Sequence, residues 1–152
     1  MVEPFFLLDE NLSPYFVPAF DSLGFEMRSV VAVFAGRRGV KEEELIPWLG
    51  KRCDCCPVWI TEDTDSRKRH AKLILEHKVS VLWLVNQGRH PLNGIQELQL
   101  LSQVIPVVAK TAAGSARPVY LEASLTSRKA KLRRLQGHLF DRQAKYETVY
   151  LD

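Results

Sequence analysis

The stretch Pro4-Phe5-Phe6-Leu7-Leu8-Asp9-Glu10-Asn11 decides the fold that we expect for this chain. Its consecutive large apolar residues are too few for a helix. They predict a strand that is buried on both faces, as in a parallel sheet covered by helices. Asp9 then lies at the carboxyl end of the strand, where ligands bind in open α/β sheets. The alternative is that Asp9 only opens a turn.

A second apolar run ends in the same way. Pro57-Val58-Trp59-Ile60 is followed by Thr61-Glu62-Asp63-Thr64-Asp65, which supplies acids and hydroxyls. Two strands with acids at their ends predict a cation site. Oxygen-only clusters of Asp and Glu suit hard cations such as Mg²⁺ or Mn²⁺. The sequence contains no phosphate-binding lysine loop and no dinucleotide glycine fingerprint, so the commonest nucleotide-binding classes are not expected.

Outward from these two runs, apolar runs alternate with helical patterns. This alternation predicts an α/β fold with a mainly parallel sheet of about five strands and right-handed crossovers. The expected strands are 4–8, one within 25–34, 58–61, 79–85 and 105–109. The expected helices are 14–23, 41–51, 65–76 and 91–104, the last with Ile95, Leu98 and Leu101 on its apolar face.

Length and composition set the class of protein. The 152 residues suffice for one domain with a continuous core. The sequence has no apolar run long enough for a membrane span and no basic signal peptide at its amino terminus, so we expect a cytoplasmic protein with no membrane partner. The cluster of Cys53, Cys55 and Cys56 fits a reducing compartment. It does not favour zinc, because no second Cys/His pair stands at ligand spacing.

Charge is distributed unevenly along the chain. Residues 1–50 carry eight acids and four bases, whereas residues 128–145 carry seven bases and one acid. An acidic front and a basic back suit a metal site beside a surface for polyanions, or a protein that dimerises. We expect 1–125 to form the α/β domain, and 126–152 to form a basic helix and tail that joins this domain or mediates oligomerisation. The spacing of Leu132, Leu135 and Leu139 suggests the helix, and residues 146–151 suggest a strand.

Three segments together resemble the PIN-like domains of the VapC-type toxin class. They are Leu7-Leu8-Asp9-Glu10-Asn11-Leu12-Ser13-Pro14, Glu42-Glu43-Glu44-Leu45-Ile46-Pro47 and Thr61-Glu62-Asp63-Thr64-Asp65, and the resemblance covers roughly residues 4–110. It implies a three-layer Rossmann-like sandwich and a divalent-metal ribonuclease. It also implies an antitoxin protein and a second copy of the chain as partners.

The same resemblance assigns the site residues. The acids expected to hold Mg²⁺ or Mn²⁺ and to be catalytic are Asp9, Glu42, Asp63 and Asp65. The metal would activate the water that hydrolyses an RNA phosphodiester. The bases expected to contact RNA phosphates beside them are Arg37, Arg38, Arg67, Lys68 and Arg69. Glu42 departs from this group of proteins, in which Asp is commoner, so its longer side chain must reach the site.

Two other functions fit parts of the pattern. The first is a PIN-like module without catalysis that binds RNA or a protein partner. The second is a receiver-type phosphoacceptor domain, which has an acid pair after its first strand, an acid after its third and a lysine after its fifth. Lys110 follows the expected strand 105–109 in that place. Hydrolysis of an oligonucleotide would identify the nuclease, and phosphorylation by a small phosphodonor would identify the receiver.

Overall fold

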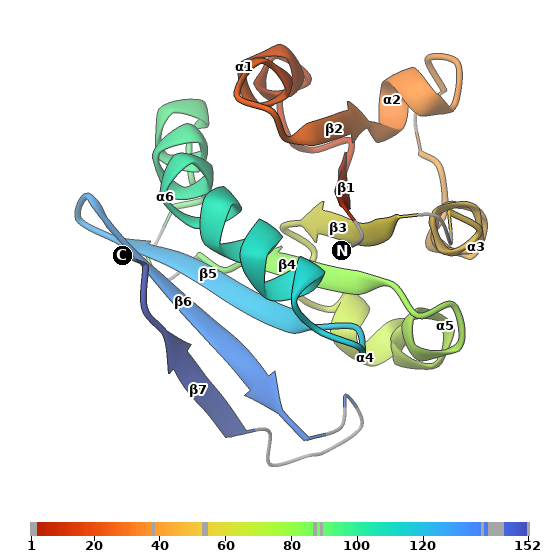
Figure 1. Cartoon of the computed structure of the whole chain (residues 1–152). Helices are drawn as coiled ribbons and strands as arrows, with labels where there is room; N and C mark the ends of the chain where they lie inside the picture. Colours follow the sequence, from red (N-terminus) through yellow and green to blue (C-terminus); the bar gives the residue numbers. More distant parts are fainter. Residues whose placement is uncertain are drawn as a thin grey trace.

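The computed structural model describes residues 3–37, 39–52, 55–86, 88, 90–137, 139 and 145–151. Within these residues it has an α/β fold with one mixed sheet of seven strands in the order β2-β1-β3-β4-β5-β6-β7 (Figure 1). The strands are β1 (Pro4–Leu8), β2 (Glu26–Ser29), β3 (Cys56–Thr61), β4 (Ser80–Leu84), β5 (Tyr120–Thr126), β6 (Lys129–Gln136) and β7 (Lys145–Val149). The helices are α1 (Phe16–Ser22), α2 (Val30–Val33), α3 (Glu42–Gly50), α4 (Ser66–Arg69), α5 (Ala71–Glu76) and α6 (Gly94–Ala113).

Strand β1 is buried on both faces, as its apolar sequence predicts. Phe6 and Leu8 belong to a core shared with α1 and α6, whereas Phe5 and Leu7 belong to a core shared with α3 and α5. Figure 1 shows these helices on the two sides of the sheet. Alternate residues of a strand point to opposite faces, so a strand covered on both sides needs apolar residues at every position.

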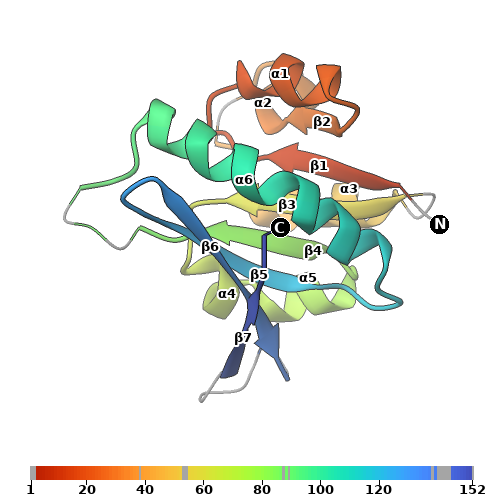
Figure 2. The same ribbon diagram turned by 60° about the vertical axis from the view of Figure 1, so that its left-hand side comes forward.

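The sheet is less parallel than expected. Strands β2, β1, β3, β4 and β5 pair in parallel, but β6 and β7 add two antiparallel pairings. Figure 2 shows the β6–β7 hairpin extending beyond the parallel strands. The segment 126–152, expected to contain a basic helix, therefore contributes strands to the same sheet.

The leucines of this segment explain the wrong prediction. Leu132 and Leu135 are three residues apart, which would place them on one face of a helix. In strand β6 they lie on opposite faces, and each is buried in a different core. Ser127, with φ of 58°, lies in the two-residue turn between β5 and β6. The expected strand at the end of the chain is present as β7, and it pairs with β6, which joins this segment to the α/β domain.

The strand expected at 105–109 is also wrong, because these residues belong to α6. Leu101, Val104, Ile105 and Val108 are all buried, with the spacing of a helical stripe. This stripe continues through Pro106, whose ring removes one backbone donor without ending the helix. Ile95 and Leu98 are exposed rather than on the apolar face. The fifth strand comes later, at β5.

The position of α6 reverses the hand of one crossover. The connections β3 to β4 and β4 to β5 move in the same direction across the sheet, yet α5 and α6 lie on opposite faces. The β4–α6–β5 crossover therefore has the opposite hand to the β3–β4 crossover, although one hand strongly predominates in proteins. As a result, α6 contacts β1 and β3, and its first turn lies at their carboxyl ends.

No helix among the described residues is both long and apolar enough to cross a lipid bilayer.

Candidate functional site

The candidate site lies where the direction of the chain across the sheet reverses. From β1 the chain passes through α1 to β2 on one side, and then returns through α2 and α3 to β3 on the other side. The carboxyl ends of β1 and β3 thus diverge into connections on opposite faces. In open α/β sheets, ligands bind in the crevice at such a switch point.

Asp9 is the first residue after β1 and is held from two directions. The Thr61 hydroxyl donates a hydrogen bond of 2.7 Å to Asp9 Oδ2, and the Glu10 N–H donates one of 3.0 Å to Oδ1. Thr61 ends β3 and is fully buried. Asp9 also opens a turn, as the alternative prediction held, because its carbonyl accepts from the Leu12 N–H. The turn and the carboxylate site therefore coexist.

Burial raises the pKa of the Asp9 carboxyl above its usual value. The hydrogen bonds from Thr61 and Glu10 act in the opposite direction, while the nearby charges of Glu42 and Glu10 raise the pKa further. A half-buried carboxylate beside two others is disfavoured in its charged form unless a cation compensates it. This electrostatic imbalance is what a bound divalent ion would relieve.

Glu42 is the first residue of α3, and α3 covers the face of the sheet toward which the Asp9 side chain is directed. Residues two apart in a strand share a face, so Asp9 continues the side of Leu7, which packs toward α3. His70 Nε2 lies 3.6 Å from Glu42 Oε2, an ion pair when the imidazole is protonated. His70 separates α4 from α5 and interrupts the single helix expected over 65–76. It was not predicted as a site residue, and its only signal was its place in a basic run.

Asp63 and Asp65 lie at the margin of this pair. The Asp63 N–H donates to Thr61 Oγ1 at 3.0 Å, so the Thr61 hydroxyl links it to Asp9. Its carboxylate, however, forms an ion pair with Arg69, in which Asp63 Oδ2 lies 2.6 Å from Arg69 Nη2. Asp65 is exposed at the start of α4 and makes no side-chain cap hydrogen bond. The structure thus brings Asp9 and Glu42 together, places Asp63 beside them with an arginine partner, and leaves Asp65 in solvent.

A second carboxyl pair lies on the other face of the sheet. Glu62 lies two residues after Ile60 and is therefore on the same face of the sheet, the face that α6 covers. Glu97, in the first turn of α6, is only 7% exposed. Burial, a hydrogen bond with Glu62 and the Glu62 charge raise the pKa of Glu97 to about 8. A proton on Glu97 therefore gives the half-buried Glu62 carboxylate a hydrogen-bond donor. The sequence contained a signal for Glu97, because it stands three and four residues before buried Leu100 and Leu101.

The basic residues expected to contact RNA have different surroundings. Arg37 pairs with Glu44, and the neighbouring Gly39 N–H donates to Glu10 Oε2 at 2.8 Å, which anchors this loop beside Asp9. Lys68 and Arg69 are exposed. Arg67 pairs instead with Glu122 of β5 at 2.8 Å. Arg38 lies outside the described residues, as do Cys53 and Asp54.

The carboxylate oxygens at this site supply some of the ligands that a hard cation needs. Among the described residues, no group of three or more His, Cys, Asp or Glu side chains is arranged to hold a metal ion. Asp9 and Glu42 nevertheless supply carboxylate oxygens, and Mg²⁺ is commonly held by one or two carboxylates together with water and phosphate oxygens. These two residues therefore fit the ligand set of such an ion.

No family model, no curated protein and no solved structure matches the chain. Its function must be inferred from its own residues. Lys110, the lysine that suggested a receiver domain, lies near the carboxyl end of α6 rather than after a strand. Lys110 thus lies toward the amino ends of the strands, whereas Asp9 lies at the carboxyl end of β1. The receiver alternative therefore loses the residue that supported it.

Proposed function

We propose that this chain is a PIN-like ribonuclease that depends on Mg²⁺ or Mn²⁺. The observation that carries the proposal is the half-buried Asp9 carboxylate, fixed by Thr61 and close enough to Glu42 to feel its charge, at the switch point of the sheet. Two carboxylates brought together in a half-buried position are costly without a cation. The resemblance of three ordered motifs to the VapC-type class supports RNA as the substrate and a Rossmann-like arrangement of the layers.

Each residue has a defined role in this proposal. Asp9 and Glu42 would hold the ion, which supplies an activated water and stabilises the leaving oxygen of a phosphodiester. Thr61 orients the Asp9 carboxylate through its 2.7 Å hydrogen bond. Arg37, in the loop before α3, and Lys68 and Arg69, on α4 after β3, would position the RNA backbone without reading its sequence.

The alternative is a PIN-like module that binds RNA or a partner protein without cleaving it. The Arg69–Asp63 ion pair favours this reading, because it occupies one of the expected metal ligands. An antitoxin protein and a second copy of this chain remain proposed partners on the same resemblance. The two functions differ in one observable, which is hydrolysis of RNA.

Cleavage of a fluorescent single-stranded RNA in the presence of Mn²⁺ or Mg²⁺ tests the proposal. We expect Asp9→Asn and Glu42→Gln to lower the cleavage rate by at least roughly 10- to 100-fold, the loss that even an outer-shell partner of a metal ligand causes. Glu43→Gln is the matched control, because Glu43 is an exposed acid in the same helical turn. RNA that binds but stays intact with either metal would identify the silent module instead.

A further inference from the structure

A cavity of about 530 Å³ lies at the end of the sheet opposite to Asp9 and Thr61. It is formed where β3 and β4 begin and where α3, α5 and α6 end, with the segment before β5 closing it. Strand β3 separates the two sites by roughly 16 Å, given its length and the rise per residue of a strand. The cavity therefore has no residue in common with the candidate nuclease site.

The close approach of two helices shapes the cavity. Gly50 ends α3 so near to His77 that an added Cβ would lie 2.7 Å from the His77 carbonyl oxygen. Only glycine allows the two helix ends to meet at this distance. The lining also includes apolar residues, among them Pro57, Ala112 and Pro118, which we call the apolar wall. Its volume falls within the range of small-molecule sites.

The charge of the cavity is strongly positive. Its described lining residues include four cations, Lys51, Arg52, Lys78 and Arg117, and a single acid, Glu76. Within the described part of the chain, none of the four cations forms an ion pair. The Arg52 guanidinium lies 4.0 Å from the centre of the Phe5 ring, and no described residue accepts a hydrogen bond from its buried Nε.

Helix ends alone do not account for this charge. Three helices end at the cavity, and each carboxyl end carries about half a negative charge, so together they offset about one and a half positive charges. The four cations and one acid have a net charge of +3, which is twice what the three helix ends can offset. The excess implies that the cavity attracts an anion in addition to complementing the helices.

Lys78 gives an independent indication. It has φ of 53°, in the left-handed region, immediately after α5. The bonds from the Lys78 N–H to the Leu75 carbonyl and from the Val79 N–H to the Ile74 carbonyl define a helix-ending turn in which glycine is usual. A lysine at this position is strained relative to glycine. Lys78 is one of the residues that line the cavity, so the strained position brings a lysine to its edge.

We propose that this cavity binds a small organic phosphate of the size of a mononucleotide. Lys78 and Arg117 hold the phosphate, and the apolar wall accommodates the organic part. This inference is independent of the proposed nuclease activity, because the two sites share no residue. A mononucleotide is the probe of choice, since it combines a compact anion with a planar apolar group.

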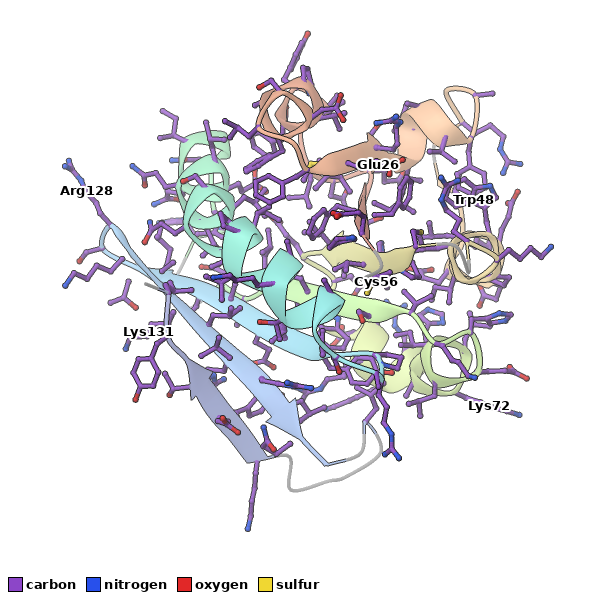
Figure 3. All side chains as sticks on the ribbon, in the orientation of Figure 1. Glu26, Trp48, Cys56, Lys72, Arg128 and Lys131 are labelled. Atoms are coloured by element: carbon purple, nitrogen blue, oxygen red, sulfur yellow. The ribbon has the colours of Figure 1, made fainter. Side chains whose placement is uncertain are left out.

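Isothermal titration of the full chain with 5′-AMP, adenosine and inorganic phosphate at low ionic strength tests the proposal. We expect saturable binding of 5′-AMP, weaker binding of inorganic phosphate and no binding of adenosine. Lys78→Gly and Arg117→Gln should each weaken 5′-AMP binding by roughly tenfold or more, as loss of a charged hydrogen bond does. Lys72→Gln is the control, because Lys72 is exposed on α5 and Figure 3 shows it directed away from the molecule.

The Lys78→Gly variant separates binding from folding. Because glycine relieves the left-handed strain, its melting temperature should be unchanged or higher while its affinity falls. Absence of saturable binding by both 5′-AMP and phosphate would overturn the proposal, as would equal affinity in the wild type and both variants. Binding of single-stranded RNA that depends on Lys78, without binding of 5′-AMP, would also overturn it and would assign the cavity to nucleic acid.

Discussion

At the scale of single residues, the carboxyl end of β3 distributes consecutive side chains to two faces of the sheet. Thr61 points toward Asp9 and Glu42, whereas the next residue, Glu62, points toward Glu97. The alternation along the chain thus directs Thr61 to the Asp9 carboxylate on one face and Glu62 to Glu97 on the other. Asp9 and Glu42 lie at the switch point, whereas Glu62 and Glu97 lie between the end of β3 and the first turn of α6.

The proton on Glu97 predicts how stability depends on pH. Its pKa rises from 4.5 in the unfolded chain to about 8 in the folded one, so the folded state holds the extra proton between these values. Stability from this group is complete below pH 4.5 and is lost as the pH rises through about 8, by up to about 1.4 kcal/mol per pH unit. Glu97→Gln should remove this slope, because its amide donates to Glu62 at every pH.

Urea denaturation at intervals between pH 5 and pH 9 measures this effect. The wild type should lose stability relative to Glu97→Gln as the pH rises, and the variant should be the more stable protein at pH 9. Glu43→Gln, which replaces an exposed acid, should follow the wild type. Parallel curves for wild type and Glu97→Gln would show that Glu97 does not carry the proton.

At the scale of elements, one carboxylate joins α4 to three strands. Glu122 of β5 accepts from Arg67 of α4, from Arg133 of β6 and from the Tyr146 hydroxyl of β7, each at 2.7–2.8 Å. Its side chain is only 15% exposed. The position of Arg67 therefore depends on the β6–β7 hairpin. A basic helix was expected for this part of the chain.

Replacement of this carboxylate should loosen the hairpin. Glu122→Gln leaves two arginines facing a neutral amide, so we expect a loss of about 1–3 kcal/mol in the free energy of unfolding. Amide exchange in β7 should accelerate more than in β1. The matched control is Glu147→Gln, since Glu147 makes an exposed hydrogen bond to Gln136 in the same hairpin. Equal exchange rates in both variants would contradict a central role for Glu122.

The sequence predicted best the elements whose residue pattern fits only one type of secondary structure. Continuous apolar runs identified β1, β3 and β4, and the acidic first turn identified α3. Beyond Val104, the strand expected at 105–109 and the basic helix expected within 126–152 were wrong, because short apolar runs and leucines at a spacing of three fit both helix and strand. The strand expected at 146–151 is confirmed as β7. Neighbouring layers decided between them, since β6 is covered on both faces. The pairing of Glu62 with Glu97 escaped for a similar reason, because it depends on which face α6 covers.

At the scale of the whole molecule, the two ends of the sheet carry opposite charges. Acids gather at the carboxyl ends of β1 and β3, whereas four bases surround the cavity where β3 and β4 begin. The chain alone has a formal charge of only +3, so neither end is visible in the total. The charge asymmetry of the sequence predicted the acidic end, but the basic end combines residues from 51 to 117.

The central claim is that Asp9 and Glu42 form a site for a divalent cation at the switch point of the sheet. Electron paramagnetic resonance of Mn²⁺ titrated into the full chain tests it directly, because the signal counts free and bound ions. We predict one bound Mn²⁺ in the wild type and in Glu43→Gln, and a loss of this binding in Asp9→Asn and in Glu42→Gln. Unchanged Mn²⁺ affinity in Asp9→Asn, or no bound Mn²⁺ in the wild type, would contradict the claim.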